Sequence, residues 1–258
     1  MNNITACGKT DTGLRRKRNE DSYLIEPLHG LFVIADGMGG HAGGDRASSM
    51  AIETVRDFIK KGLMDNEITW PFGVDNSLPR EINIISSGMR LANKLIFNES
   101  MGMGTTMVTL LIRDDNAYIC HVGDSRLYRI RSSAIEQITE DHSLVAEEVR
   151  RGILTKEQAK NYSLRHVITK AIGTASDIEC DCKVEKILTG DIFLLCSDGL
   201  SGMLDDPEIL DLINNPPIPP LVKGDEGGFL ENRCERLIKR ANEKGGDDNI
   251  TAILVRYT

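Results

Sequence analysis

Short runs of apolar and β-branched residues recur along the chain, each bounded by glycine, aspartate or another turn-forming residue. Runs of this length and composition are typical of strands, because β-branched side chains pack well on a pleated surface. The pattern therefore predicts a core rich in β-sheet. The expected strands are 4–9, 22–26, 31–35, 105–112, 117–122, 126–130, 135–139, 181–187, 192–196 and 250–257.

Two longer segments, 45–63 and 80–97, instead repeat their apolar residues at the period of an amphipathic helix. Asp45 is expected to cap the first of them. They follow one another between groups of strands, so together they could cover one sheet. Shorter helices are predicted at 143–151, 155–160, 207–213 and 230–243. Helix pairs between two groups of strands favour the α+β class, with a sandwich of two sheets and helices on its outer faces.

The chain shows neither an internal repeat nor an interdomain linker, so a single domain over 1–258 is expected. Two segments have neither the helical nor the strand period. These are 69–79 and 214–228, the second of which contains four prolines and three glycines. We expect both to be surface loops, with a partner-binding role as the alternative for the second.

Composition and charge exclude several classes of protein. Apolar residues make up 40% of the chain and charged residues 27%, which argues against disordered and fibrous proteins. The net charge of −8 gives no support to non-specific binding of nucleic acid or acidic membranes. The first residues lack the basic and apolar stretches of a secretory signal, and no apolar run approaches the ~20 residues of a membrane span. We therefore expect a cytoplasmic protein with no nucleic-acid or membrane partner.

None of the six cysteines lies in a C-x-x-C pair, and several stand within apolar runs. Buried thiols explain this distribution better than disulfides or zinc ligands. Cys180 and Cys182 lie two residues apart in a predicted strand and would share a face, for which a redox or metal role is the alternative. The cysteines therefore agree with a reducing compartment.

Acidic residues stand at the ends of several predicted strands, often beside glycine. They are Glu20, Asp21, Asp36, Asp124, Asp198, Asp247 and Asp248. Any single Asp-Gly or Gly-Asp pair is better explained as a turn. Their repetition at strand ends favours a shared site instead. Because oxygen ligands without a zinc-like spacing of histidine or cysteine suit magnesium or manganese, we expect a site for hard divalent cations.

Seven short blocks follow one another along almost the whole chain. They are R-x-x-N-E-D at 16–21, D-G-M-G-G-H at 36–41, M-G-T-T at 103–106, V-G-D-S-R at 122–126, T-E-D-H-S at 139–143, S-D-G-L at 197–200 and D-D-N-I-T at 247–251. In this order they resemble the type 2C metal-dependent Ser/Thr protein phosphatases, above all their compact bacterial form. The resemblance implies a four-layer α-β-β-α sandwich of two mainly antiparallel sheets flanked by helix pairs.

The resemblance also implies ligands for two Mn²⁺ or Mg²⁺ ions. Asp36 would bridge both metals, and the carbonyl of Gly37 would bind the second. Asp198 and Asp248 would complete the protein ligands of the first metal. Each of these residues occupies the matching position of its block.

Three further acidic residues receive roles from the same resemblance. Glu20 and Asp21 would hold the second metal directly or through water, and Asp124 would contribute to a third, weaker metal site. Family members often carry another aspartate four residues after the one in S-D-G, where this chain has Gly202. The two-metal set is therefore complete, whereas the third site lacks this carboxylate.

The implied reaction is hydrolysis of phosphoserine and phosphothreonine by direct attack of a hydroxide that bridges the two metals, without a phosphoenzyme. Arg16 would bind the phosphoryl oxygens through its planar guanidinium. His41, beside the bridging aspartate in the sequence, would protonate the leaving serine or threonine oxygen. His142 would instead orient or cap.

Three other features complete the expected site. Asp141 either caps the helix that begins near Ser143 or touches metal. Thr105 and Thr106 would pack and form hydrogen bonds behind the metals. Residues 143–173 resemble the family's flap, which lies beside the active site and influences the choice of substrate.

Two alternatives belong to other functional classes. A catalytically silent phosphatase-like module would bind a phosphoprotein or regulatory partner, but it should have lost metal aspartates that this chain keeps. A two-metal hydrolase of small phosphate esters is the second alternative. Under the leading hypothesis the partners are phosphorylated protein substrates and a cognate Ser/Thr protein kinase, and we expect a monomer.

Overall fold

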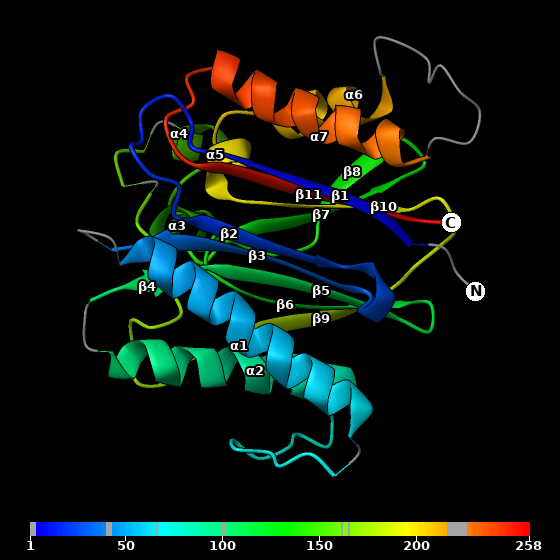
Figure 1. Ribbon diagram of the computed structural model, residues 1–258. Helices are drawn as coiled ribbons and strands as arrows, with labels where there is room; N and C mark the ends of the chain where they lie inside the picture. The colour runs from blue at the N-terminus through cyan, green and yellow to red at the C-terminus, as the bar shows by residue number, and fades with distance from the viewer. Residues whose placement is uncertain are drawn as a thin grey trace.

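Figure 1 shows the computed structural model, which describes residues 4–39, 43–65, 67–99, 102–160, 162–164, 166–215 and 226–258. Two sheets lie face to face. The outer side of one is covered by α1 (Gly44–Met64) and α2 (Arg80–Asn98), and that of the other by α6 (Asp206–Asn214) and α7 (Glu226–Glu243). The predicted α+β class and the four-layer α-β-β-α sandwich are therefore confirmed.

Neighbouring strands in both sheets run antiparallel. The first sheet has the order β1-β11-β10-β7-β8, and the second has the order β2-β3-β5-β6-β9, with the short β4 paired to β3. The strands of the first sheet are β1 Ile4–Asp11, β7 Arg126–Arg131, β8 Ala134–Gln137, β10 Ile192–Cys196 and β11 Ile250–Tyr257. Those of the second are β2 Asp21–Glu26, β3 Leu31–Met38, β4 Gly104–Thr105, β5 Met107–Arg113, β6 Asn116–Val122 and β9 Asp181–Lys186.

β3 is buried on both faces, because successive side chains of a strand point to opposite sides of the sheet. Leu31, Val33 and Ala35 pack toward α1 and α2. Phe32 and Ile34 pack between the two sheets. β11 divides its side chains in the same way between α7 and the inter-sheet core. Each of these strands is thus held from both sides, which fixes the position of the acidic residues at its end.

The predicted strand 105–112 is divided into β4 and β5 in the structure. At the break, the backbone N–H of Thr106 donates to the carbonyl of Asp36 at 2.8 Å. The predicted end of β8 at 139 is also wrong, because the strand ends at Gln137. Both differences follow from contacts with distant segments, which local composition does not reveal.

Four smaller helices lie between these elements in the described ranges, and two of them were not predicted. They are η1 Pro27–His29, α3 Leu144–Arg150, α4 Lys156–Lys160 and α5 Asp198–Ser201, of which η1 and α5 are the unpredicted ones. The predicted cap of α1 is wrong: Gly43 is the N-cap, and Asp45 lies in the first turn, where its carboxylate accepts from the N–H of Arg46 at 2.8 Å.

The predicted loop 69–79 joins α1 to α2 and packs through aromatic residues. Arg80 lies over the ring of Trp70, and Arg90 over that of Phe72. Of the predicted loop 214–228, residues 216–225 lie outside the described part, while its last three residues belong to α7. No helix in the described ranges is long and apolar enough to cross a membrane.

The prediction of free buried thiols is wrong for four cysteines. Cys7 of β1 is joined to Cys234 of α7, and Cys120 of β6 to Cys182 of β9. The antiparallel register places Cys120 directly opposite Cys182. Cys180 and Cys196 are free. The paired cysteines lie 227 and 62 residues apart in sequence, so only the fold brings them together.

Candidate metal and phosphate site

Five aspartates from both sheets meet at one end of the sandwich. Asp21 begins β2 and stands opposite Asp36 of β3 in the antiparallel register. Asp124 follows β6, Asp198 begins α5 directly after β10, and Asp248 lies just before β11. The other four all lie close enough to Asp36 to raise its pKa. These five residues are called the Asp36 cluster below.

Asp21 ties the ends of the two sheets together. Its Oδ2 accepts hydrogen bonds from the hydroxyls of Ser197, directly after β10, at 2.8 Å and of Thr251 in β11 at 2.6 Å, so both donors come from the other sheet. Burial nevertheless raises the pKa of Asp21 to about 6, and the charges of Asp198 and Asp248 act in the same direction. The carboxyl is therefore firmly positioned but costly to ionise.

The backbone of Asp36 is fixed by two fully buried threonines. The hydroxyl of Thr106 accepts from the Asp36 N–H at 3.2 Å, and the hydroxyl of Thr105 donates to the Asp36 carbonyl at 2.8 Å. The prediction that these threonines pack and form hydrogen bonds behind the aspartates is thus confirmed. The Asp36 carboxylate is left to face the rest of the cluster.

Burial and repulsion between like charges raise the pKa of the remaining central carboxyls. The pKa of Asp36 lies well above its ordinary value, first because it is buried and then because of the charge of Asp21. Burial, followed by the charges of Asp198 and Asp141, raises the pKa of Asp124 to about 8. Burial likewise raises the pKa of Asp198. The cluster therefore favours either protons or cations.

Three carboxylate oxygens of the cluster are buried without a hydrogen-bond partner in the described part of the chain. They are Oδ1 of Asp21, of Asp124 and of Asp198. An unpaired buried polar atom costs free energy, and an unpaired buried charge costs more. A bound cation would remove that cost for all three, so the electrostatics of the cluster fit a cation-binding role.

Two glycines allow the chain to approach the cluster closely. A Cβ on Gly37 would lie 2.1 Å from the carbonyl oxygen of Gly44, and one on Gly44 would lie 2.6 Å from Oε2 of Glu20. The N–H of Gly37 also donates to the Glu20 carbonyl at 3.2 Å. Burial raises the pKa of Glu20, and Asp45 raises it further. Glu20 is therefore held beside the residue that follows Asp36.

In the described ranges, no three His, Cys, Asp or Glu side chains already stand in a coordination arrangement. The donor set nevertheless fits hard divalent cations, because it consists of carboxylates, and magnesium and manganese prefer oxygen ligands. The unpaired oxygens point to the same chemistry. The six acidic residues to which the resemblance gives metal roles lie in the cluster or, in the case of Glu20, beside it, whereas Asp141 lies in a neighbouring network.

Arg16 lies at the rim of the cluster. Its guanidinium donates to Oδ2 of Asp248 at 2.6 Å, and its side chain is 53% exposed. Burial lowers the pKa of Arg16, but the hydrogen bond to Asp248 and the charges of Asp198 and Asp36 outweigh this effect and raise it. A permanent cation is thus anchored beside the carboxylates while remaining open to solvent.

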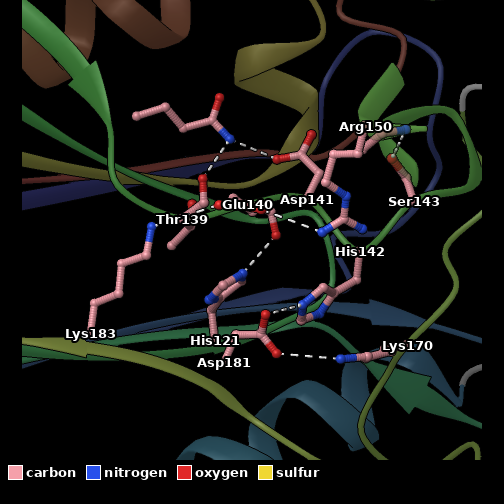
Figure 2. A network of polar contacts seen from close by, with 12 residues as sticks. His121, Thr139, Glu140, Asp141, His142, Ser143, Arg150, Lys170, Asp181 and Lys183 are labelled. Atoms are coloured by element: carbon pink, nitrogen blue, oxygen red, sulfur yellow. Dashed lines mark hydrogen bonds and ion pairs between the residues drawn. The ribbon is translucent and has the colours of Figure 1, made fainter. Parts of the chain in front are cut away.

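The T-E-D-H-S segment lies next to the cluster in a separate network of polar contacts (Figure 2). Asp141 accepts from Nε of Arg126 at 3.0 Å and from its terminal nitrogen at 2.7 Å. Ser143, not Asp141, caps α3, since its hydroxyl accepts from the N–H of Ala146. The capping alternative for Asp141 is therefore wrong, because its carboxylate is occupied by an arginine of β7.

His142 orients the turn that carries Asp124. Its Nδ1 accepts from the N–H of Gly123 at 3.1 Å, and its ring stacks on that of His121 with centroids 4.8 Å apart. Gly123 has a positive φ of 103°, and a Cβ there would lie 2.5 Å from Thr106. This contact agrees with the orienting alternative for His142, while its role in the reaction stays a prediction.

Gly202, which stands where family members often carry an aspartate, lies close to the backbone of α5. Gly202 ends α5, and its N–H donates to the carbonyl of Asp198 at 2.6 Å. A Cβ at Gly202 would lie 2.8 Å from that same oxygen. An aspartate at this position would therefore require α5 to shift.

Two histidines are relevant to the question of which side chain protonates the leaving group. His41, predicted from the sequence, lies outside the described residues. His166 was not singled out from the sequence, yet its charge lowers the pKa of Asp198, so it stands near the cluster. It belongs to the segment 143–173 that resembles the flap. The only sequence signal for His166 was the presence of a histidine in that segment. Because His166 lies far from the aspartates in the sequence, its spatial proximity to Asp198 could not be predicted.

Known proteins similar to this chain agree with a phosphatase fold and with the acidic cluster described above. The family model "Protein phosphatase 2C" matches residues 15–254. The Serine/threonine phosphatase stp of Listeria monocytogenes is 34% identical over 254 residues, covering 96% of this chain and 93% of its own length. Protein phosphatase PhpP of Streptococcus pneumoniae is 35% identical over 250 residues, covering 95% of this chain and 94% of its own length.

Solved structures show the same fold over nearly the whole chain. The serine/threonine phosphatase PstP/Ppp of Mycobacterium tuberculosis has a TM-score of 0.81 and 30% identity, with 98% of both chains covered. The catalytic domain of PstP in complex with two manganese ions has a TM-score of 0.79 and 30% identity, with 99% of this chain and 98% of that chain covered. The chain therefore belongs to the protein phosphatase 2C family.

Proposed function

We propose that this chain is a metal-dependent phosphatase that hydrolyses phosphoserine and phosphothreonine in proteins. The observation that carries the proposal is the Asp36 cluster, whose buried carboxylates raise one another's pKa and leave three oxygens unpaired beside Arg16. The family relatives named as serine/threonine phosphatases support this substrate class, and the manganese-bound PstP structure supports a binuclear centre.

The metals would be two Mn²⁺ or Mg²⁺ ions. When bound, they would supply a more acidic water as nucleophile and neutralise charge on the phosphoryl group. Asp36 would contact both ions, and a third, weaker site would use Asp124. The other proposed ligands are Asp198 and Asp248 for the first ion, and Glu20, Asp21 and the Gly37 carbonyl for the second.

Arg16 would bind and orient the phosphoryl group. Its guanidinium carries five N–H donors in a planar fork, and Asp248 holds it at the rim with about half of the side chain exposed. Two parallel hydrogen bonds to phosphoryl oxygens would then fix the phosphorus in one orientation. The serine or threonine oxygen needs a proton as it leaves, and His41 is the proposed donor.

The reaction also defines a partner. The substrate must be a protein already phosphorylated on serine or threonine, so a Ser/Thr protein kinase must act before this enzyme. We propose that the chain acts as a monomer; Arg16 and the carboxylates of the cluster all belong to this chain, so the proposed site requires no residue from a second copy.

The decisive experiment measures phosphate release from a phosphothreonine peptide with Mn²⁺, with excess chelator, and with Asp36→Asn or Asp198→Asn. We expect activity that requires Mn²⁺ and that disappears with chelator or with either substitution. Asp57→Asn is the matched control, because Asp57 lies on α1 with a side chain that is 68% exposed. It should leave the activity unchanged.

Two results would contradict the proposal. If the folded wild type binds Mn²⁺ but releases no phosphate from any phosphopeptide, the binding-module hypothesis gains support. If it hydrolyses small esters such as p-nitrophenyl phosphate but no phosphopeptide, a hydrolase of small phosphate esters replaces the proposed enzyme.

A further inference from the structure

A run of four cations borders the Asp36 cluster. Arg15, Arg16, Lys17 and Arg18 lie in the connection between β1 and β2, and all four are exposed. Figure 1 shows this connection in blue, at the same end of the molecule as α3 and α4. Since the whole chain carries a net charge of −8, this run is a local positive patch on an acidic protein.

The basic connection is fixed in place by the backbone. The N–H groups of Leu14 and Arg15 donate to the carbonyl of Gly246 at 2.7 and 3.2 Å. Farther along, the side-chain amide of Asn249 donates to the carbonyl of Arg18 at 2.9 Å. Both partners flank Asp248, so the segment and the cluster are parts of one rigid unit. Its side chains are therefore presented at a defined distance from the site.

The four cations differ in their partners. Arg16 binds Asp248, and Arg15 lies 3.7 Å from Asp247. In the described ranges, neither Lys17 nor Arg18 has a carboxylate within 4.0 Å. The charge of Arg18 acts on Glu20 from a longer distance. Lys17 and Arg18 are thus the two cations of the run that are available to an external anion.

We propose that Lys17 and Arg18 bind acidic side chains that flank the phosphorylated residue of the substrate. This inference rests on the proposed function, because it assumes that Arg16 holds the phosphoryl group. Lys17 and Arg18 follow Arg16 directly, within about 4 to 8 Å along the backbone. An extended peptide rises about 3.3 Å per residue, so these cations reach positions roughly one to four residues from the phosphoresidue.

The chemistry favours a phosphopeptide over other polyanions. Nucleic acid would have to approach an acidic protein, and two exposed cations make too few phosphate contacts for strong electrostatic binding. An acidic peptide, in contrast, needs one or two ion pairs in addition to the phosphoryl contact. Exposed pairs contribute little individually, so the selection should amount to about fivefold to tenfold. The inference names a substrate class, namely phosphoproteins with Asp or Glu beside the phosphorylated Ser or Thr.

The test compares two phosphothreonine peptides that differ only in their flanking residues, Glu in one and Lys in the other. The wild type should show a kcat/KM about fivefold to tenfold higher for the Glu peptide, mostly through KM, and 0.5 M salt should reduce the ratio because it screens exposed charges. The double variant Lys17→Glu/Arg18→Glu should abolish or reverse the preference. Its activity on p-nitrophenyl phosphate, which has no flanking residues, measures any general effect of the charge reversal on Glu20 and the metal site, so the ratio between the two peptides, and not the absolute rate, tests the inference.

A matched control makes the same change in net charge away from the site. Lys61 near the end of α1 and Lys186 at the end of β9 are both exposed, and Lys61→Glu/Lys186→Glu should keep the wild-type ratio. Equal kcat/KM for both peptides, or a preference that survives the Lys17/Arg18 reversal, overturns this inference while the proposed phosphatase stands. Absence of hydrolysis of both peptides by the wild type overturns the proposed function and this inference with it.

Discussion

Two groups of acidic residues lie next to each other at the same end of the sandwich, and they differ in their partners. The Asp36 cluster is called the unpaired group below, and Asp141 with Asp181 the paired group. In the Asp36 cluster, carboxylates face other carboxylates, and three of their oxygens have no hydrogen-bond partner in the described part of the chain, although Asp248 at the rim binds Arg16. In the neighbouring network of Figure 2, Asp141 is bound by Arg126, and Asp181 lies 3.3 Å from both His142 and Lys170. The groups are close enough for Asp141 to raise the pKa of Asp124.

The difference separates structural charge from functional charge. Buried carboxylates that already have cationic partners stabilise one arrangement of the chain, and removing either partner is costly. Buried carboxylates without such partners destabilise the chain by themselves and are retained where a ligand supplies the missing charge. Neutralising a residue should therefore have opposite consequences in the two groups.

The largest expected effect is that of Asp36→Asn on activity. Loss of a carboxylate shared by two metals should lower kcat/KM for a phosphothreonine peptide by more than about a thousandfold, on the order of 4 kcal/mol of transition-state stabilisation. The free energy of unfolding in chelator should rise, because the buried Asp36 carboxyl must either carry a charge that faces Asp21 or take up a proton, and asparagine avoids both costs. Both values can be measured on the same preparation, by phosphate release and by urea denaturation.

A free energy of unfolding in chelator that is lower for Asp36→Asn than for the wild type would contradict the distinction between the two groups. It would mean that Asp36 stabilises the fold in the manner of Asp141, and that lost activity reflects damage to the structure. Asp57→Asn on the exposed face of α1 supplies the baseline for both measurements.

The next largest effect is expected for Asp141→Asn. Arg126 loses a carboxylate that accepts from its Nε and from one terminal nitrogen, and the Gln137 amide loses its charged acceptor at 2.9 Å. Leaving one partner of a largely buried pair uncompensated costs about 3 kcal/mol or more. Urea denaturation in chelator should show this loss. A change below about 1 kcal/mol would show that the pairing contributes little.

The sequence predicted the members of the Asp36 cluster better than the partners of Asp141 and Asp181. Strand β11 coincides with its predicted bounds, 250–257, because its apolar run ends in clear turn signals. The aspartates were found because each stands at the end of such a run, and the order of the blocks pointed to the family. Local pattern was sufficient wherever a residue's role depends on its own strand.

The paired group depends on partners that local pattern does not reveal. Asp141 was expected to cap a helix or touch metal, whereas its partner Arg126 lies 15 residues earlier on another strand. The disulfide between Cys7 and Cys234 spans 227 residues. Helix α5 is only four residues long, too short for periodicity to reveal it. These features follow from the packing of the sheets and could not be inferred from composition.

A pH titration sharpens the comparison at Asp124, where the two groups meet. The pKa of this carboxyl rises from 3.8 to about 8 on folding, so the folded protein binds the proton more tightly. Its contribution to stability is therefore present at low pH and is lost as the pH rises from about 4 to about 8. In chelator, the wild type should lose up to about 1.4 kcal/mol per pH unit relative to Asp124→Asn between pH 5 and 7.5, roughly one proton.

Urea denaturation of both proteins at several pH values gives this difference directly. Titration of groups that do not face Asp124 is common to both proteins and cancels, whereas the pKa of Asp36 falls in the variant because the charge of Asp124 no longer raises it. Equal slopes for the two proteins would show that Asp124 is ionised in the folded state.

The smallest effect is expected at the solvent-exposed edge of the paired group. Lys170 and Asp181 have side chains that are 42% and 46% exposed, and their charged atoms lie 3.3 Å apart. Water screens such a pair, so Lys170→Met should lower the free energy of unfolding by less than about 1 kcal/mol. Asp181 keeps its contact with His142, which is 3% exposed. A loss above about 2 kcal/mol would show that the paired carboxylates act as one coupled network, in which even an exposed cation is needed to hold the segment beside Asp124.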